Sequence, residues 1–401
     1  MGDSTRSKSV SARKPNKPYA DFPLYAHATR RWAKKVKGRT RFYGPWDDPT
    51  AALNEWLRCK DYHLAGREPP PIRIDAYTVE DACNDFCASK EAKRDAGEIT
   101  PRSYYDFHQA AIRAARVLGK HAAVLDLTPD DFLRLRKDIA KDRGLVAQGN
   151  EIQRIRSIFK HAFDEGEIPT PVRFGQTFKK PRPDAIRKAR EAKKAIHGDR
   201  MLSSKETRAA IEKASPALKA MILLGINCGF GATDCANLPR RAVDLEKGWV
   251  TFARVKTGES RRIPLWKETV DAISAWLAIR PEPKDPADEH LIFLTKYRTP
   301  WVKLNAKGTP DDSVGKEFTK LLKDLGLKRP GVSFYALRHA TETIGGETHD
   351  QVAVNAIMGH VDASMAAHYR ERIEASRLLA VTNHIRAWLF PADEEAEGGA
   401  Q

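Results

Sequence analysis

Two proline-rich stretches divide this chain of 401 residues into three segments with different sequence patterns. The first stretch, at 65–74, reads AGREPPPIRI, and the second, at 168–200, begins IPTPVRFG and continues with many lysines and arginines. Proline-rich linkers stay extended and separate units that bury their own cores. We therefore expect a disordered basic arm at 1–18, domains at 19–75, 76–167 and 201–391, a basic linker at 168–200 and an acidic tail at 392–401.

The chain has a strong excess of positive charge, with 69 lysines and arginines against 53 aspartates and glutamates and a formal net charge of +16. This balance favours a polyanionic partner, above all nucleic acid, over a merely soluble basic protein. Five cysteines without framework spacing favour a reducing compartment. The most apolar run, at 217–230, is too short to span a bilayer, and the N-terminus lacks the apolar segment of a secretory signal. We expect a cytoplasmic protein without a membrane partner.

The first segment interleaves aromatic and basic residues. RRWAKKV and RTRFYG alternate like strands around a turn at Lys37–Gly38, which predicts a β-hairpin, and Asp48-Pro49 predicts the start of a helix. Lysines and arginines on paired strands can meet phosphates in a DNA groove, and we favour this over a solvated basic face above an aromatic core. The candidate DNA-binding residues of the hairpin are Arg31, Lys34, Lys35, Arg39 and Arg41.

The second segment has the pattern of four short helices. Thr78, Thr100 and Thr128 are predicted N-caps, the latter two followed by proline at the first helical position. A fourth helix at 148–166 has an apolar stripe made of Ile152, Ile155, Ile158, Phe159 and Phe163. The expected bundle fits either a scaffold or a DNA clamp.

The basic linker separates two basic modules. Such a tether crosses a phosphate backbone if the modules embrace a duplex, and a solvated hinge fits the pattern equally well. Its candidate DNA-binding residues are Lys179, Lys180 and Arg182.

The third segment mixes helices with one clear hairpin. Strands at 250–255 and 261–265 flank the turn KTGES, and several amphipathic helices follow. The final helix has a largely apolar pattern, formed by Leu378, Leu379, Val381, Ile385, Trp388 and Leu389. The chain as a whole is therefore predicted to be mainly α with small β elements, an α+β fold.

Polar residues whose side chains could take part in catalysis lie at three places in this segment. Lys256 lies where the first hairpin strand meets its turn, and Arg338 with His339 lies early on a helix in YALRHA. His360 follows Met358-Gly359, and Tyr369 comes nine residues after it. Each of these residues alone is more often structural than catalytic.

Taken in this order, however, the motifs resemble the catalytic domain of the tyrosine recombinases, the phage integrase family. The resemblance rests on these motifs in order: KTG followed by R-IPL, then LRHA, then GH with a tyrosine nine residues later. It extends over about residues 20–390 and implies an N-terminal arm-type DNA-binding domain, a helical core-binding domain of the SAM-like type, and a mixed α/β catalytic domain.

The resemblance implies a role for each motif residue. Tyr369 attacks the scissile phosphate to give a 3′-phosphotyrosyl link, and Lys256 protonates the leaving 5′-hydroxyl. Arg338 and His360 donate to the phosphate oxygens, and Asp234 and His339 support them. Tyr335 takes the position, three before Arg338, where the family usually has histidine.

No metal, ATP or other cofactor is expected. The implied partners are double-stranded DNA with specific sites and other copies of the chain, in a tetramer on two duplexes. The resemblance implies that the final helix docks on a neighbouring protomer. The alternative is that this helix packs on its own domain.

One position departs from the family pattern. NCGFGATDCANL, at 227–238, has Gly231 where the family has its first catalytic arginine, although the acid at Asp234 is present. An arginine at developing phosphoryl charge is worth roughly 10³–10⁵ in rate. Another cation can take its place, and the candidates are Arg240, Arg241, Arg261 and Arg262. Alternatively, the chain is a slow recombinase, or it binds and bridges DNA without cutting it.

The sequence therefore predicts a site-specific DNA recombinase or integrase from a mobile element, working at the nucleoid. The first rival is a catalytically degenerate DNA-binding relative with an architectural or regulatory role. The second is an enzyme like the type IB topoisomerases, which relax DNA by the same cut. An arm-like first domain favours the recombinase, because a second DNA-binding module suits assembly at complex sites.

Overall fold

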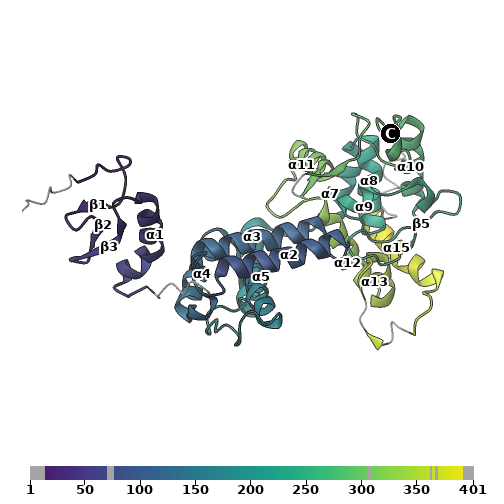
Figure 1. Cartoon of the computed structure of the whole chain (residues 1–401). Coiled ribbons are helices and arrows are strands. Elements are labelled where there is room, and N and C mark those ends of the chain that lie inside the picture. Colours follow the sequence, from purple (N-terminus) through teal and green to yellow (C-terminus); the bar gives the residue numbers. More distant parts are fainter. Residues whose placement is uncertain (1–13, 70–75, 306–308, 362–363, 366–368, 392–401) are drawn as a thin grey trace, which may run out of the picture. The chain divides into compact units, whose positions relative to one another are not determined.

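The computed structural model describes residues 14–69, 76–305, 309–361, 364–365 and 369–391. The predicted acidic tail and all but the end of the predicted basic arm lie outside these residues. Contacts within the chain divide it into two compact units, 1–186 and 187–401, each described separately below. The fold is mainly helical with small antiparallel sheets, which confirms the predicted class (Figure 1). None of the helices described could cross a bilayer, since they are too short or too polar.

The N-terminal unit begins with a three-stranded antiparallel sheet and one helix. The predicted hairpin is present, and Lys37 and Gly38 both have positive φ, 48° and 80°, as a two-residue hairpin turn requires. Trp32, Tyr43 and Trp56 fill the core between sheet and helix. A first short strand, which the sequence pattern did not predict, pairs with the hairpin. The elements are β1 (Tyr25–His27), β2 (Arg31–Val36), β3 (Arg39–Pro45) and α1 (Pro49–Ala65).

A helical bundle completes this unit. Its helices are α2 (Val79–Asp95), α3 (Pro101–Leu118), α4 (Pro129–Asp142) and α5 (Leu145–Asp164), with the short 3-10 helix η1 (Val124–Asp126) between α3 and α4. Three of the helices begin as predicted: Thr78 and Thr128 form capping boxes, and Thr100 accepts a hydrogen bond from a backbone N–H. The fourth, α5, begins at Leu145, three residues before the predicted start at 148. Of the predicted stripe on α5, Phe163 alone is exposed (39%), because it lies in the last turn beyond the bundle core.

The predicted linker is partly structured. Phe178 is fully buried and lies 5.3 Å, between ring centres, from Phe132 of α4. Helix α6 (Pro183–His197) follows, and the division between the two units falls inside it. Residues up to Phe178 therefore belong to the bundle core, because their aromatic side chains are buried there.

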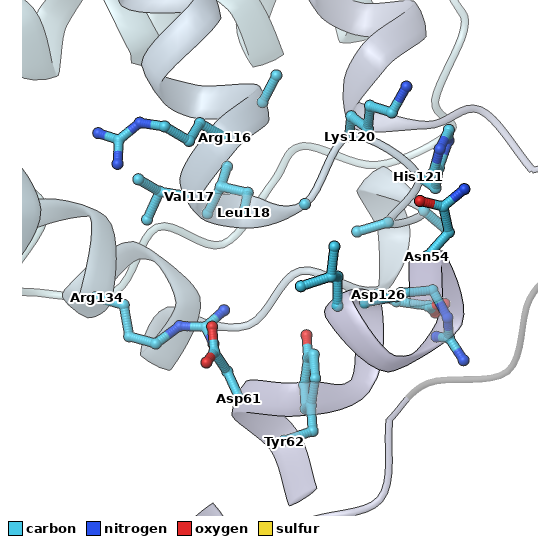
Figure 2. Close-up of a pocket in the computed structure, with 16 residues that line it drawn as sticks. Asn54, Asp61, Tyr62, Arg116, Val117, Leu118, Lys120, His121, Asp126 and Arg134 are labelled. Atoms are coloured by element: carbon cyan, nitrogen blue, oxygen red, sulfur yellow. The ribbon is translucent and has the colours of Figure 1, made fainter. Parts of the chain in front are cut away.

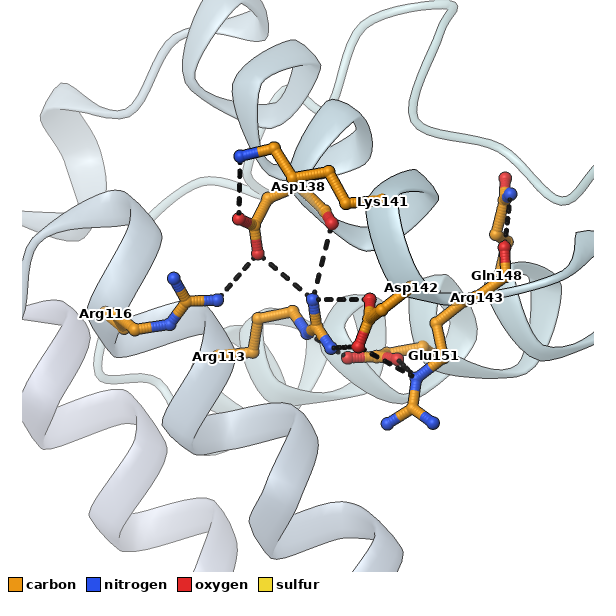
Figure 3. Close-up of polar contacts among 8 residues, drawn as sticks. All are labelled: Arg113, Arg116, Asp138, Lys141, Asp142, Arg143, Gln148 and Glu151. Carbon is orange, nitrogen blue, oxygen red and sulfur yellow. Dashed lines mark hydrogen bonds and ion pairs between the residues drawn. The ribbon is translucent and has the colours of Figure 1, made fainter.

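Arg113 is the centre of an ion-pair network that joins three helices of the bundle (Figure 3). Its guanidinium on α3 contacts Asp138 and Asp142 of α4 and Glu151 of α5, at 3.0, 2.8 and 2.6 Å. The hydrogen bond from Arg113 holds the pKa of Asp142 below its ordinary value, and the same bond raises the pKa of Arg113. The network fixes the ends of the helices to one another.

The C-terminal unit is built around one helix, α8, of which nearly every side chain is buried. It packs against α10 and α12 in the largest core of the chain. The helices of this unit are α7 (Ser204–Lys213), α8 (Pro216–Asn227), α9 (Ala232–Ala236), α10 (Lys267–Ile279), α11 (Ser313–Asp324), α12 (Tyr335–Gly346), α13 (Gln351–Met358) and α15 (Ala375–Leu389). Its strands and 3-10 helices are β4 (Val243–Asp244), β5 (Trp249–Thr251), β6 (Arg262–Pro264), β7 (Val302–Leu304), β8 (Pro310–Asp312), η2 (Arg240–Ala242) and η3 (Pro286–Asp288).

The hairpin of this unit is shorter than predicted. Strand β5 ends at Thr251 and β6 begins at Arg262, whereas the alternation had suggested strands at 250–255 and 261–265. The backbone N–H of Arg254 still donates to the carbonyl of Glu259, at 2.8 Å, so the connection is a closed turn. The side chain of Arg261, directly before β6, is buried.

The final helix, α15, packs on its own unit. Leu378, Val381, Ile385 and Leu389 are buried in the core beside α12 and α13. The indole N–H of Trp266 also donates to the carbonyl of Thr382 at 2.9 Å. In this structure of a single chain, the apolar face of the final helix is therefore packed on its own unit.

Candidate active site

Arg338 ties together two segments of the C-terminal unit. It lies in the first turn of α12 and is only 2% exposed. Its Nη1 donates to the carbonyl of Gly229 and its Nη2 to that of Met358, each at 2.5 Å. Burial lowers the pKa of Arg338, but arginine starts so high that the group stays charged. Within the described part of the chain it has no carboxylate ion-pair partner, so it is a buried cation held by carbonyls.

His360 directly follows the end of α13. Gly359 takes the left-handed conformation, with φ 60°, and the backbone N–H of His360 donates to the carbonyl of Asn355. The imidazole is 38% exposed, and its Nδ1 lies 3.8 Å from Glu342. Burial lowers the pKa of His360, and the charges of Arg338 and Arg254 add to this against the opposing effect of Glu342. The imidazole is therefore neutral at pH 7.

Asp234 joins the start of α9 to the hairpin. One carboxylate oxygen accepts from the backbone N–H of Gly231 at 2.9 Å, and the other accepts from Arg261 at 3.0 Å. Arg261 is 1% exposed, and its guanidinium carbon lies 4.4 Å from the ring centre of Phe230. Burial lowers the pKa of Arg261, against the attraction of Asp234. Asp234 and Arg261 thus fix the hairpin against α9.

The other predicted residues of the hairpin and of α12 are exposed. Lys256 lies in the turn between β5 and β6 with its side chain in solvent. Tyr335 is 49% exposed, and its ring packs edge-on against His339 one helical turn later, with ring centres 5.1 Å apart. Partial burial and the nearby charge of Arg200 lower the pKa of His339. These two rings form an exposed pair beside the buried Arg338.

Tyr369 lies between α13 and α15, on a segment of which 362–363 and 366–368 are outside the described residues. Its side chain is 80% exposed. The residues that follow it, from Arg370 to Ile373, line a cavity of about 520 Å³ together with His360 and the hairpin residue Arg262. The structure therefore brings the chain neighbours of Tyr369 to His360 and the hairpin, but it does not place the phenol against Arg338 or Lys256.

A separate cavity of about 480 Å³ lies in the N-terminal unit (Figure 2). Tyr62 of α1 and Arg134 of α4 line it, and the guanidinium carbon of Arg134 lies 5.6 Å from the Tyr62 ring centre. None of the residues predicted to be catalytic or to bind DNA lines this cavity. The candidate active site therefore lies in the C-terminal unit alone.

Comparison with known proteins agrees with this location. Residues 200–375 match the model of the phage integrase family. This segment is similar to that family. The match confirms the resemblance to tyrosine recombinases inferred from the sequence.

Individual relatives span most of the chain. Tyrosine recombinase XerC of Ralstonia pickettii (strain 12J) is 21% identical over 334 residues, which cover 75% of this chain and 93% of XerC. A lambda integrase tetramer bound to a Holliday junction is 18% identical, covering 89% of this chain and 99% of that one, with a TM-score of 0.55. A lambda integrase dimer bound to a COC′ core site is 16% identical, covering 90% and 99%, also with a TM-score of 0.55. These similarities show that the fold is shared.

The four arginines predicted from the sequence as replacements for the missing cation have different surroundings. Arg261 is occupied by Asp234, Arg262 lies over the ring of Trp249 at 4.3 Å, and Arg240 pairs with Glu289 at 3.3 Å. Arg241 is exposed on the 3-10 helix η2.

Arg254 is a further residue of this site, one that the sequence motifs did not single out. Its Nη1 donates to the carbonyl of Gly359 at 3.1 Å. The sequence motifs gave no signal for this residue, because its contact joins segments far apart in the chain.

The predicted DNA-binding residues divide into two groups. On the hairpin, Arg31, Lys35 and Arg39 are exposed. Lys34 is half-buried over the Trp56 ring, 5.0 Å from its centre, and Arg41 pairs with Glu68 at 2.7 Å. In the predicted linker the exposed residues are Lys179, Lys180 and Arg182. Lys34 and Arg41 thus contact other side chains of the N-terminal unit, whereas the side chains of the other six predicted residues are exposed to solvent.

Proposed function

We propose that this protein is a site-specific recombinase that cuts and rejoins duplex DNA through a 3′-phosphotyrosyl intermediate. The observation that carries the proposal is that His360 and the residues directly after Tyr369 line one cavity. The buried cation Arg338 is bound to the carbonyl of Met358, two residues before His360. Anion-binding groups and a tyrosine segment therefore meet at one corner of the segment that is similar to the phage integrase family.

Tyr369 is the nucleophile in this proposal. Its oxygen forms a bond to the scissile phosphorus while the bond from phosphorus to the 5′ oxygen breaks, and the electron pair of that bond stays on the 5′ oxygen. The leaving oxygen takes a proton from Nζ of Lys256, and the phenolic proton passes to water. The 5′-hydroxyl of a partner strand then attacks the phosphotyrosine, releasing Tyr369. One ester replaces another at each step, so the cycle conserves the bond energy.

Arg338 and His360 stabilise the charge that develops on the phosphate oxygens. A guanidinium and an imidazole N–H fixed before the reaction need not reorganise when that charge appears. Arg338 is held by two carbonyls, and the helix end at Gly359 fixes the backbone of His360. Their partial removal from water strengthens each interaction with the phosphate.

The proposed partners are double-stranded DNA and further copies of this chain. The net charge of +16 and the exposed arginines and lysines of the first hairpin support DNA binding. The lambda integrase tetramer bound to a Holliday junction supports an assembly of four copies on two duplexes. Since α15 packs on its own unit, we expect its buried face to remain within each protomer.

One observation favours a second candidate function. Gly231 stands where the family has its first catalytic arginine, and a protein without that cation can bind and bridge DNA without cutting it. An enzyme like the type IB topoisomerases would use the same chemistry as the recombinase. Its product would be relaxed DNA, whereas the product of a recombinase has exchanged strands.

Covalent trapping tests the proposal. Nicked duplexes cut from the DNA on either side of the gene are incubated with the protein, and covalent adducts are detected on denaturing gels. We expect adducts with wild type and none with Tyr369→Phe, while Tyr297→Phe, an equally conservative change at an exposed tyrosine, forms them normally. DNA binding without any wild-type adduct would overturn the recombinase in favour of the degenerate relative. Plasmid relaxation without strand exchange would favour the topoisomerase.

A further inference from the structure

The position that lacks its expected arginine has room for one. Gly231 has φ −87° and ψ 172°, a conformation open to any residue. A Cβ added there would meet only an oxygen of Asp234, at an ordinary 3.6 Å. Neither backbone strain nor crowding therefore requires glycine at this position. The backbone and the immediate neighbours of Gly231 therefore do not explain why the arginine expected at this position is absent.

Arg254 reaches the same corner from the hairpin. Its Nη1 donates to the carbonyl of Gly359 at 3.1 Å, while Arg338 donates to the carbonyl of Met358, the preceding residue. Two guanidinium groups thus bind consecutive peptide carbonyls immediately before His360. A Cβ on Gly359 would lie 3.1 Å from both Cβ and Cδ of Arg254, so the glycine permits this close approach.

Glu342 lies 3.8 Å from Nδ1 of His360, but no carboxylate in the described part of the chain forms an ion pair with Arg254 or Arg338. Arg254 and Arg338 have only carbonyl partners in the described part of the chain, and Asp234 is paired with Arg261. Burial lowers the pKa of both Arg338 and His360, and the charge of Arg254 lowers both further. Like charges held together out of water are costly unless an anion joins them. A phosphodiester is such an anion, and guanidinium groups bind it well.

Arg254 is better placed for this than Arg261, which is also a candidate to replace the missing cation. Arg261 is 1% exposed and its Nη2 is taken by Asp234, so it cannot approach DNA without breaking a buried ion pair. Arg254 is half-buried, and its head group binds the carbonyl of Gly359, directly before the partly exposed His360. It also precedes Lys256 by two residues, so both are carried by the same turn.

We propose that Arg254 takes the place of the arginine missing at Gly231 and binds the scissile phosphate together with Arg338. This inference rests on the proposed recombinase function and names the residue that completes its site. The cation then comes from the hairpin turn, whereas the family pattern has it at the start of α9.

The test measures the rate of covalent adduct formation in a single turnover at saturating nicked duplex, with DNA affinity measured separately. We expect Arg254→Ala to slow the rate by about 10²–10³-fold, the usual loss for one oxyanion donor, and Arg254→Lys to slow it less. Arg298→Ala is the matched control, since the Arg298 guanidinium also donates to backbone carbonyls, those of Glu282 and Pro283, but does not line the cavity of His360. It should react at the wild-type rate. Thermal unfolding of each variant confirms that it is folded.

A rescue experiment separates a phosphate contact from a structural role. Adding Gly231→Arg to Arg254→Ala should restore much of the lost rate, because the second guanidinium then comes from the family's usual position. Failure of this rescue, with the double variant folded, would overturn the inference, as would an Arg254→Ala rate equal to that of wild type. In both cases loss of the adduct in Tyr369→Phe would leave the proposed function standing. A wild type that forms no adduct would overturn that function and this inference together.

Discussion

Asp234 and Arg261 form an ion pair at 3.0 Å inside the C-terminal unit, with side chains 10% and 1% exposed. Asp234 also accepts the backbone N–H of Gly231 and, at 3.4 Å, that of Val255. One carboxylate therefore connects the start of α9 to both sides of the hairpin turn that carries Lys256. The acid of the family pattern has a structural part in this chain, whatever its part in catalysis.

Removing this carboxylate should destabilise the unit. Asp234→Ala leaves Arg261 buried without a counter-charge, which costs about 3–5 kcal/mol. The measurement is equilibrium unfolding in urea. Asp244→Ala is the control, because the pair of Asp244 with Lys247 is exposed and should contribute less than about 1 kcal/mol. Equal effects of the two substitutions would contradict the role of the Asp234–Arg261 pair.

The network around Arg113 should stabilise the helical bundle. Arg113→Ala leaves Glu151 and Asp138, 9% and 15% exposed, with fewer cations, so we expect a loss of about 3 kcal/mol by urea unfolding. Lys160→Ala breaks an exposed pair on α5 and should cost less than about 0.5 kcal/mol. The pKa of Asp142 lies below its ordinary 3.8 in the fold, so its contribution is present above pH 3.8 and is lost as the pH falls through the folded-state value. Arg113→Ala should therefore weaken the acid dependence of stability.

His360 should titrate below its ordinary pKa of 6.5, because burial and two arginines oppose its protonation. The unfolded chain then binds more protons than the folded one as the pH falls through 6.5, so His360 makes the fold less stable in acid and has no such effect above that range. NMR titration, with His360→Asn to assign the signal, measures this pKa directly. Arg254→Ala should raise it, since one positive charge is removed. An unchanged value would show that Arg254 is not close enough to act on the imidazole.

The first hairpin should contribute phosphate contacts. Lys35→Ala removes an exposed cation, and we expect weaker DNA binding with a salt slope reduced by about 1. Binding is measured against salt concentration by fluorescence anisotropy. Lys60→Ala, which removes an exposed lysine of α1, should leave the slope as it is. A slope unchanged by Lys35→Ala would favour the solvated basic face over DNA contact.

The helix starts could be predicted from the sequence because their causes are local. Asp48, Thr78 and Thr100 each accept the hydrogen bond of a backbone N–H three residues later, and the residues between are enough to specify that geometry. The hairpin turn at Lys37–Gly38 is equally local. The motif residues Arg338, His360 and Tyr369 could be found for a different reason, since their order and spacing follow a known family.

Long-range packing decided what local patterns did not contain. Arg254 meets the carbonyl of a residue 105 positions away, and no periodicity of the hairpin specifies that contact. The sequence shows that position 231 lacks the expected arginine. Only the tertiary structure shows that Arg261 is buried and paired with Asp234. The sequence by itself determined the elements, the family and the chemical groups. The tertiary structure alone decided which of those groups are free to meet a phosphate, because burial and pairing depend on segments far apart in the chain.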